Sequence, residues 1–145
     1  MDPPNSALFD VYLALVSIGW IDGRLDSGER ALILRAAERD GMAKAELSRL
    51  EEASHWPVSF EDCVPVLSRS MNHFTYGMGT LIAQIDGVVQ TVEEAALDAL
   101  AQVLGITPKE REQIDSLAGE FLTRGCDPGA FEPDAFRAEI AAAVR

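Results

Sequence analysis

The feature that most constrains the fold of this chain is a repeat: the sequence resembles itself when it is shifted by 64 residues. The segment "IDGRLDSGER" at residues 21–30 returns as "IDGVVQTVEE" at residues 85–94. Ser27 opposite Thr91 preserves the chemistry of a helix cap. Identical residues at this spacing include the pairs Ile18/Ile82, Ile21/Ile85, Asp22/Asp86, Gly23/Gly87, Glu29/Glu93, Ala31/Ala95, Ala37/Ala101, Gly41/Gly105 and Glu46/Glu110.

Each half, about residues 7–53 and 71–124, is therefore predicted to contain a helix, an Asp-Gly turn, a second helix, a glycine stop and a third helix. One half alone would leave too much apolar surface exposed, so we expect the two halves to pack face to face around a shared core. A pseudo-two-fold arrangement of this kind would bring the two Asp-Gly turns into related positions. A chain of 145 residues is accordingly expected to form one domain over residues 1–145.

Apolar residues recur at helical spacing nearly throughout, and no segment alternates as a strand would, which predicts an all-α fold. The helix at residues 92–104 is apolar on most sides, and this predicts a central position for it. Gly41 and Gly105 are expected to end helices. Thr107, Pro108 and Glu110 together predict a capping box. The expected helices cover about residues 8–19, 28–40, 44–53, 68–85, 92–104 and 108–124, with a short terminal helix carrying Phe136, Ile140 and Val144.

The chain is strongly acidic, with 24 Asp and Glu residues against 12 Lys and Arg residues and a net charge of −12. This charge repels nucleic-acid phosphates and anionic membrane surfaces, and it favours cations or a basic protein partner. The apolar run near the N-terminus lacks a basic flank and is interrupted by Asp10, so we expect a core helix and a cytoplasmic location. Cys63 and Cys126 are isolated and do not predict a disulfide framework.

The carboxylates around the Asp-Gly turns allow two explanations. An Asp at a helix end opposes the helix dipole, yet it can accept hydrogen bonds from turn amides and from the next helix, so the acids can be ordinary turn and capping chemistry. Alternatively, Asp22, Asp26 and Glu29 lie within eight residues around one turn and can offer oxygen ligands to Ca²⁺ or Mg²⁺. The spacing is not that of an EF-hand. Both explanations can hold together.

The segments "ALVSIGWIDGRLDSGE" and "MGTLIAQIDGVVQTVE", each followed by a glycine stop, resemble the TerB family of tellurite-resistance and DjlA N-terminal-like domains over roughly residues 7–121. The resemblance implies a compact bundle of about seven helices. It also implies a link to tellurite, metal or stress responses, with acidic loops that chelate a metal. Gln90 stands where a counterpart of Asp26 would be, so the second loop is the weaker ligand set. The residues that match the implied metal site are Asp22, Asp26, Glu29, Asp86 and Glu93.

Other chemistry-bearing residues favour structural roles. Phe74, Met78 and Ile82 fall at helical spacing and are expected in the core, while His55 and His73 have no metal-ligand or catalytic spacing. No nucleophile, base and oxyanion set can be assembled, so we expect no enzyme. The sequence thus predicts a TerB-like cytoplasmic binding module that takes a divalent cation. The alternative is a protein-interaction adaptor with purely structural turns, which docks a basic or membrane-associated partner.

Overall fold

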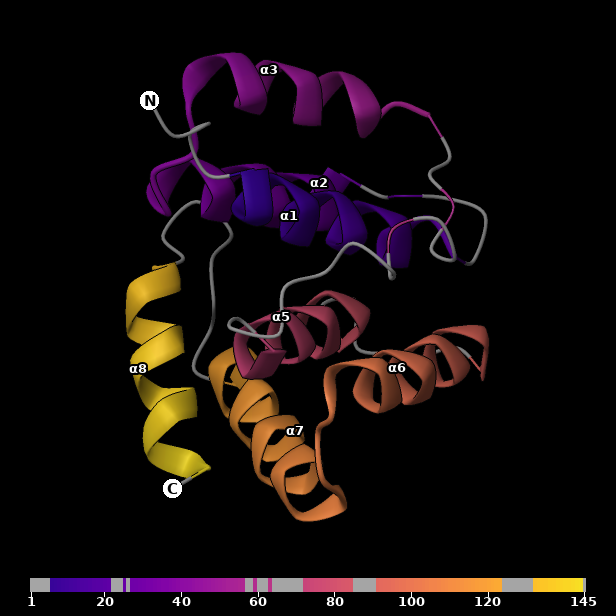
Figure 1. Cartoon of the computed structure of the whole chain (residues 1–145), viewed down its shortest axis with the longest axis vertical. Helices are drawn as coiled ribbons and strands as arrows, with labels where there is room; N and C mark the ends of the chain where they lie inside the picture. The colour runs from indigo at the N-terminus through magenta and orange to yellow at the C-terminus, as the bar shows by residue number, and fades with distance from the viewer. Residues whose placement is uncertain are drawn as a thin grey trace.

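A computed structural model describes residues 6–21, 25, 27–56, 59, 63, 72–84, 91–123 and 132–144 of the chain. All regular structure in these residues is helical, which confirms the predicted all-α class and a compact arrangement of seven helices (Figure 1). The helices are α1 (Ser6–Gly19), α2 (Ser27–Arg39), α3 (Lys44–Ala53), α5 (Asn72–Gln84), α6 (Thr91–Leu104), α7 (Pro108–Thr123) and α8 (Pro133–Ala143).

The helices form two groups joined through α1 and α5. Helix α1 packs against α2 and α3 at one end of the long axis, and α5 packs against α6 and α7 at the other end (Figure 1). The two groups meet where α1 lies on α5. Helix α8 runs along the side of the molecule and packs against α5 and α7 (Figure 1). Among the described helices none is long and apolar enough to cross a membrane.

Helix α5, and not α6, occupies the centre of the bundle. Ten consecutive residues of α5 are buried, from Phe74 to Ala83, and this helix contacts α1, α2, α6, α7 and α8. Gly77 and Gly79 make the close approach possible, because an added Cβ would lie 2.6 Å from Ile140 Cδ1 at the first position and 3.1 Å from Ile18 Cδ1 at the second.

The predicted central position of residues 92–104 is therefore wrong. Among the helices that the structure describes, α5 is the only one against which α6 packs extensively. The number of apolar residues in α6 suggested a buried helix, but many of these residues are alanines. The small side chain of alanine costs little free energy when it stays in water. The exposed face of α6 contains Glu94, Ala95, Asp98, Ala99, Gln102 and Val103.

Gly41 and Gly105 end α2 and α6 in the same way, as predicted. Both glycines have positive φ, 90° and 72° respectively, a conformation that glycine adopts without steric cost. After each glycine the chain closes the Schellman type of helix end. Its long hydrogen bond joins the Met42 N–H to the Ala37 carbonyl at 3.1 Å, and the Ile106 N–H to the Ala101 carbonyl at 2.9 Å.

The capping box predicted at the start of α7 is confirmed. The Glu110 N–H donates to Thr107 Oγ1 at 3.1 Å, and the Thr107 N–H donates to Glu110 Oε1 at 3.0 Å. The corresponding start of α3 has Ala43 at the cap position and no side-chain cap. The third helices of the two groups also differ in packing, since α3 lies against α2 whereas α7 diverges from α6 (Figure 1).

Candidate functional site

Most of the predicted cation ligands lie outside the described residues. This holds for Asp22, Asp26 and Asp86, and for the side chain of Glu93, whose backbone is in the first turn of α6. Glu29 is described with its side chain. Within the described part of the chain, no group of three or more His, Cys, Asp or Glu side chains is placed to hold a metal ion. The five-residue cation site therefore stays a prediction.

Glu29 lies in the first turn of α2 and is only 5% exposed. Its carboxylate reaches the end of α1, because a Cβ added to Gly19 would lie 3.3 Å from Glu29 Oε2. The same Cβ would collide with Leu25, so Gly19 leaves room for both side chains. A buried carboxylate is stable only when it is hydrogen-bonded or paired. The position of Glu29 between two helix ends fits the structural explanation of the turn acids.

A first buried polar cluster joins α1, the end of α2 and α8. The Tyr12 hydroxyl donates to Asp40 Oδ2 at 3.1 Å, and the Arg137 guanidinium donates to both carboxylate oxygens of Asp40 at 2.8 and 3.1 Å. The side chain of Asp40 is 7% exposed. Arg137 also lies over the Phe74 ring, 4.0 Å from its centroid, and pairs with the exposed Asp134. This cluster fastens α8 to the rest of the molecule.

A second cluster of the same composition joins α5, α6 and α7. The Tyr76 hydroxyl donates to Asp115 Oδ1 at 2.9 Å and accepts a hydrogen bond from Arg111 Nε at 2.7 Å. The buried Thr80 hydroxyl also donates to Asp115, at 3.2 Å. Arg111 extends on to Asp98 of α6. The hydrogen bonds of this cluster join three helices, while the carboxylates of Asp98 and Asp115 keep 58% and 41% of their side-chain surface exposed.

Tyr12 and Tyr76 are themselves 64 residues apart, and they are the only tyrosines of the chain. The spacing of the repeat was therefore a usable signal for both clusters, although the sequence analysis did not single the tyrosines out. Their carboxylate and arginine partners come from positions that the repeat does not relate. Comparing the two halves of the sequence therefore identifies the two tyrosines as equivalent, but it does not identify the aspartates and arginines that bind their hydroxyls.

Both tyrosines should resist ionisation in the folded protein. Burial, with the charge of Asp40, raises the pKa of Tyr12 well above its usual range, and burial, with the hydrogen bond to Asp115, raises the pKa of Tyr76 to about 12. Since tyrosine in the unfolded chain ionises near pH 10, the stability contributed by the neutral Tyr76 hydroxyl is complete below about pH 10 and is lost as the pH rises through about 12. The pKa of Tyr12 is raised further, so its hydroxyl stays neutral in the folded protein over this range.

We therefore expect a spectrophotometric titration to show no tyrosinate absorbance at about pH 10 in the native protein, whereas the urea-unfolded chain is half ionised there. Substitution Tyr76→Phe should weaken the loss of stability above about pH 10. A native titration with a midpoint near 10 for either tyrosine would contradict the buried clusters.

The remaining predicted roles are structural in the described residues. Phe74, Met78 and Ile82 are buried in the core, as expected. Cys63 is buried as a small apolar residue. His73 is satisfied by Glu110 of the capping box, with 2.9 Å between Nε2 and Oε2. This contact joins the start of α5 to the start of α7.

Among the helices that the structure describes, the acidic excess is largest on α6 and α7. Helices α6 and α7 together carry seven acidic and two basic residues, whereas α1, α2 and α3 together carry six acidic and five basic residues. The two groups lie at opposite ends of the long axis (Figure 1). We call the surface formed by α6 and α7 the acidic face. Of its two basic residues, Arg111 pairs with Asp98 and donates to Tyr76, so this ion pair removes one base and one acid from the exposed charge.

Comparisons with known proteins add no relative. No family model, no curated protein and no solved structure matches the chain. The resemblance to the TerB family therefore stays a prediction, and the function has to be argued from the residues themselves.

Proposed function

We propose that this protein is a non-catalytic binding module that recognises a positively charged protein partner through its acidic face. The observation that carries the proposal is the difference in charge between the two described groups of helices, with an excess of five acids on α6 and α7 and of one acid on α1, α2 and α3, which lie at opposite ends of the long axis (Figure 1). Such an uneven field raises the rate at which a basic partner meets the acidic end, and it orients that encounter. This function corresponds to the adaptor alternative of the sequence analysis.

The arrangement of the polar side chains supports a binding role over a catalytic one. The hydroxyls of Tyr12 and Tyr76 and the buried carboxylate of Asp40 are hydrogen-bonded to one another's cluster partners and to the arginines inside the fold. A catalytic site instead needs a base or nucleophile directed at an open position. The side chains of Glu94 and Glu112, on α6 and α7, are exposed to solvent.

We also infer that the chain descends from a duplicated helical unit of the TerB-like type. The equivalent glycine stops after α2 and α6, the paired tyrosines and the packing of α1 on α5 support this inference. The divergence of α7 from α6 differs from the packing of α3 against α2 and does not support this inference (Figure 1). A role in tellurite, metal or general stress responses rests on the family resemblance alone.

The test compares two variants with the same total charge. Replacing Glu94, Glu112 and Glu120 with glutamine removes three exposed acids from the acidic face, and replacing Glu38, Glu51 and Glu52 removes three from α2 and α3. With a fluorescent polylysine peptide as the probe, we expect the first variant to bind at least about fivefold more weakly and the second to bind nearly as the parent does. Equal losses would show a response to net charge alone and would refute a specific face.

A divalent cation at the Asp-Gly turns is a second candidate function, supported by the repeated acidic pattern of the sequence; Glu29, in the first turn of α2, is the predicted ligand whose side chain the structure describes. We expect calorimetric titration with Ca²⁺ or Mg²⁺ to give heat that an Asp22→Asn, Asp86→Asn variant lacks. The same variant melted in a chelator measures the structural share of the turn acids. Absence of heat in the parent protein would leave the turns with a structural role only.

A further inference from the structure

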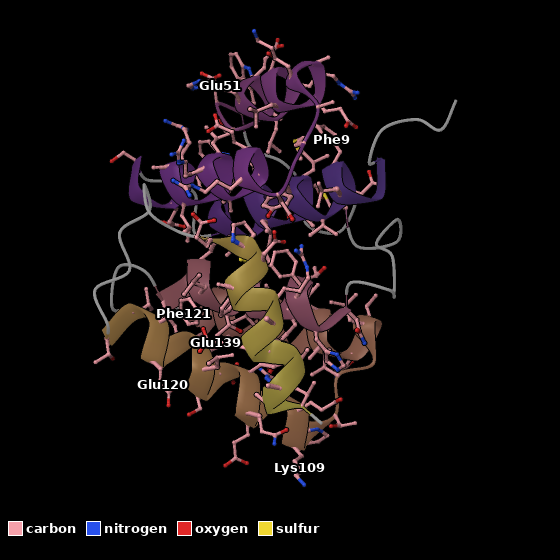
Figure 2. The ribbon with its side chains drawn as sticks, turned by 90° about the vertical axis from the view of Figure 1, so that its left-hand side faces the viewer. Phe9, Glu51, Lys109, Glu120, Phe121 and Glu139 are labelled. Carbon is pink, nitrogen blue, oxygen red and sulfur yellow. The ribbon has the colours of Figure 1, made fainter. Side chains whose placement is uncertain are left out.

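Helix α8 inserts two apolar side chains between α5 and α7. Phe136 is fully buried, and its ring lies edge-to-face against Phe74 of α5 and Phe121 of α7, with 6.5 and 4.7 Å between the ring centroids. One turn further along, Ile140 is buried against Gly77, where an added Cβ would lie 2.6 Å from Ile140 Cδ1. Figure 2 shows α8 facing the viewer, with Phe121 beside it. We call the surface of α5 and α7 that takes these two side chains the α8 docking surface.

An ion pair adds a directional contact beside the apolar ones. Arg137 directly follows Phe136, and its guanidinium donates to both carboxylate oxygens of Asp40, at 2.8 and 3.1 Å. The same guanidinium lies 4.0 Å from the centroid of the Phe74 ring. Helix α8 is therefore held by three side chains at a fixed spacing: an aromatic ring, an arginine at the next position and an aliphatic side chain four positions after the ring.

The docking surface is built by helices that hold one another in place. Helices α5 and α7 pack against each other more extensively than any other pair of described helices. Asp40, which receives the arginine, is also bound to α1 through the Tyr12 hydroxyl at 3.1 Å. These contacts do not involve α8. We therefore expect the docking surface to keep its shape when α8 is absent.

Helix α8, in contrast, depends on the docking surface. It has 11 residues, and an isolated helix shorter than about 12 residues is marginal in water. Its buried residues are Pro133, Phe136 and Ile140. Without the docking surface these side chains would enter water and the helix would unfold. A short helix that docks on a stable surface in this way is expected to open as one unit while the rest of the fold stays intact.

We propose that the α8 docking surface is a helix-binding site, that α8 is its intramolecular occupant, and that a helix of a partner protein displaces α8. The partner helix carries an aromatic residue, an arginine at the next position and an aliphatic residue four positions after the aromatic one. Competition with α8 keeps the site closed until the partner helix is present at sufficient concentration. This site goes beyond the proposed function, because its contacts are those of buried side chains and not of the acidic face.

The contacts of α8 define this occupant. Each of its three anchoring side chains has a partner on the protein, so a helix with the same anchors can make the same contacts. The α8 of a second copy would carry these anchors as well. It would, however, bring together two chains that each have a net charge of −12, which electrostatic repulsion opposes.

The experiment weakens α8 in the full chain and offers a helix in trans. The variant Phe136→Ala removes the main anchor, and the probe is a fluorescently labelled peptide of residues 132–145. This peptide has three acidic and two basic residues, so the acidic face does not attract it. The matched control, Leu50→Ala, truncates another fully buried side chain, which lies in α3 at the end of the molecule away from α7 (Figure 1).

We expect the peptide to bind the Phe136→Ala chain at least about tenfold more tightly than the parent, because its competitor is weakened. The Leu50→Ala chain should bind it no more tightly than the parent does. A peptide with Phe136→Ala should not bind, and one with Arg137→Gln should bind at least about fivefold more weakly. Equal binding by the parent and the Phe136→Ala chain, absence of binding by both, or undiminished binding of the Phe136→Ala peptide would overturn the proposal.

Hydrogen exchange of the parent is a second test that needs no variant. The amides of α8 should exchange together, at least about tenfold faster than the amides of α5. Exchange of α8 only at the rate of α5 would show that α8 does not open separately and would overturn the proposal. A dimer of the parent that Phe136→Ala abolishes would assign the docking surface to a second copy and overturn the partner helix. None of these results alters the polylysine test of the acidic face.

Discussion

Replacing Asp40 with alanine is expected to lower the free energy of unfolding by about 2–4 kcal/mol, since removing one partner of a buried ion pair leaves the other uncompensated. Asp40 accepts hydrogen bonds from Tyr12 and from both terminal nitrogens of Arg137, and its own side chain is 7% exposed. Arg137 remains 35% exposed and can regain some water, which places the expected loss below the largest values for such pairs. Urea denaturation followed by circular dichroism measures it.

The control for Asp40 is another carboxylate that binds the same arginine. Asp134 also pairs with Arg137, at 2.9 Å, but its side chain is 85% exposed. The substitution Asp134→Ala should therefore change stability by no more than about 0.5 kcal/mol. If both substitutions cost the same, burial does not decide the strength of this cluster, and its role in fastening α8 is smaller than the geometry indicates.

The second large effect is expected from Phe136→Ala, at about 3–5 kcal/mol. Phe136 is fully buried, and its ring lies edge-to-face against Phe74 and Phe121, with centroid distances of 6.5 and 4.7 Å. Truncation would leave a cavity where α8 meets α5 and α7. Because α8 loses its main apolar contact, amide hydrogen exchange in that helix should quicken more than in α2.

The matched variant Phe136→Leu keeps most of the buried volume and should cost less than about 1.5 kcal/mol. The two substitutions together separate the volume of the side chain from its aromatic character. A loss below about 1 kcal/mol for the alanine variant, with unchanged exchange in α8, would mean that α8 does not depend on this ring.

The helices and their ends were largely predictable, because local chemistry determines them. Gly41, Gly105 and the pair Thr107 and Glu110 act through their immediate neighbours in the chain, and each ends or starts a helix as expected. The predicted range 44–53 coincides with α3. Glycines with positive φ and capping boxes depend on a few adjacent residues, so they can be predicted from the local sequence.

The central position of α5 was not predictable in this way. Counting apolar residues favoured α6, whereas the buried positions of α5 include Thr75, Gly77, Gly79 and Thr80, which such a count passes over. Small residues in a central helix allow neighbours to approach, so their value appears only when the neighbours are known. The hydrophobic pattern alone therefore predicted that α6 is more central than α5, whereas α5 is the central helix.

The polar clusters and the α8 docking surface were hidden from sequence for a related reason. Asp40 and Arg137 are 97 residues apart, and nothing in the spacing joins them. The repeated Asp-Gly predicted a cation site at the acidic loops, but three of its five predicted ligands lie outside the described residues. The excess of acidic over basic residues in α6 and α7 can be counted from the sequence. The sequence does not show, however, that these two helices lie at the same end of the molecule.

The attachment of α8 has a consequence for how the protein is made. The bonds from Arg137 to Asp40, and from Glu132 to Arg39, connect the end of α2 to the last described helix. Phe136 fills the core beside them. During translation, the apolar surface of the earlier helices stays partly exposed until α8 has left the ribosome and packs against them. In that interval the nascent chain should depend most on chaperones.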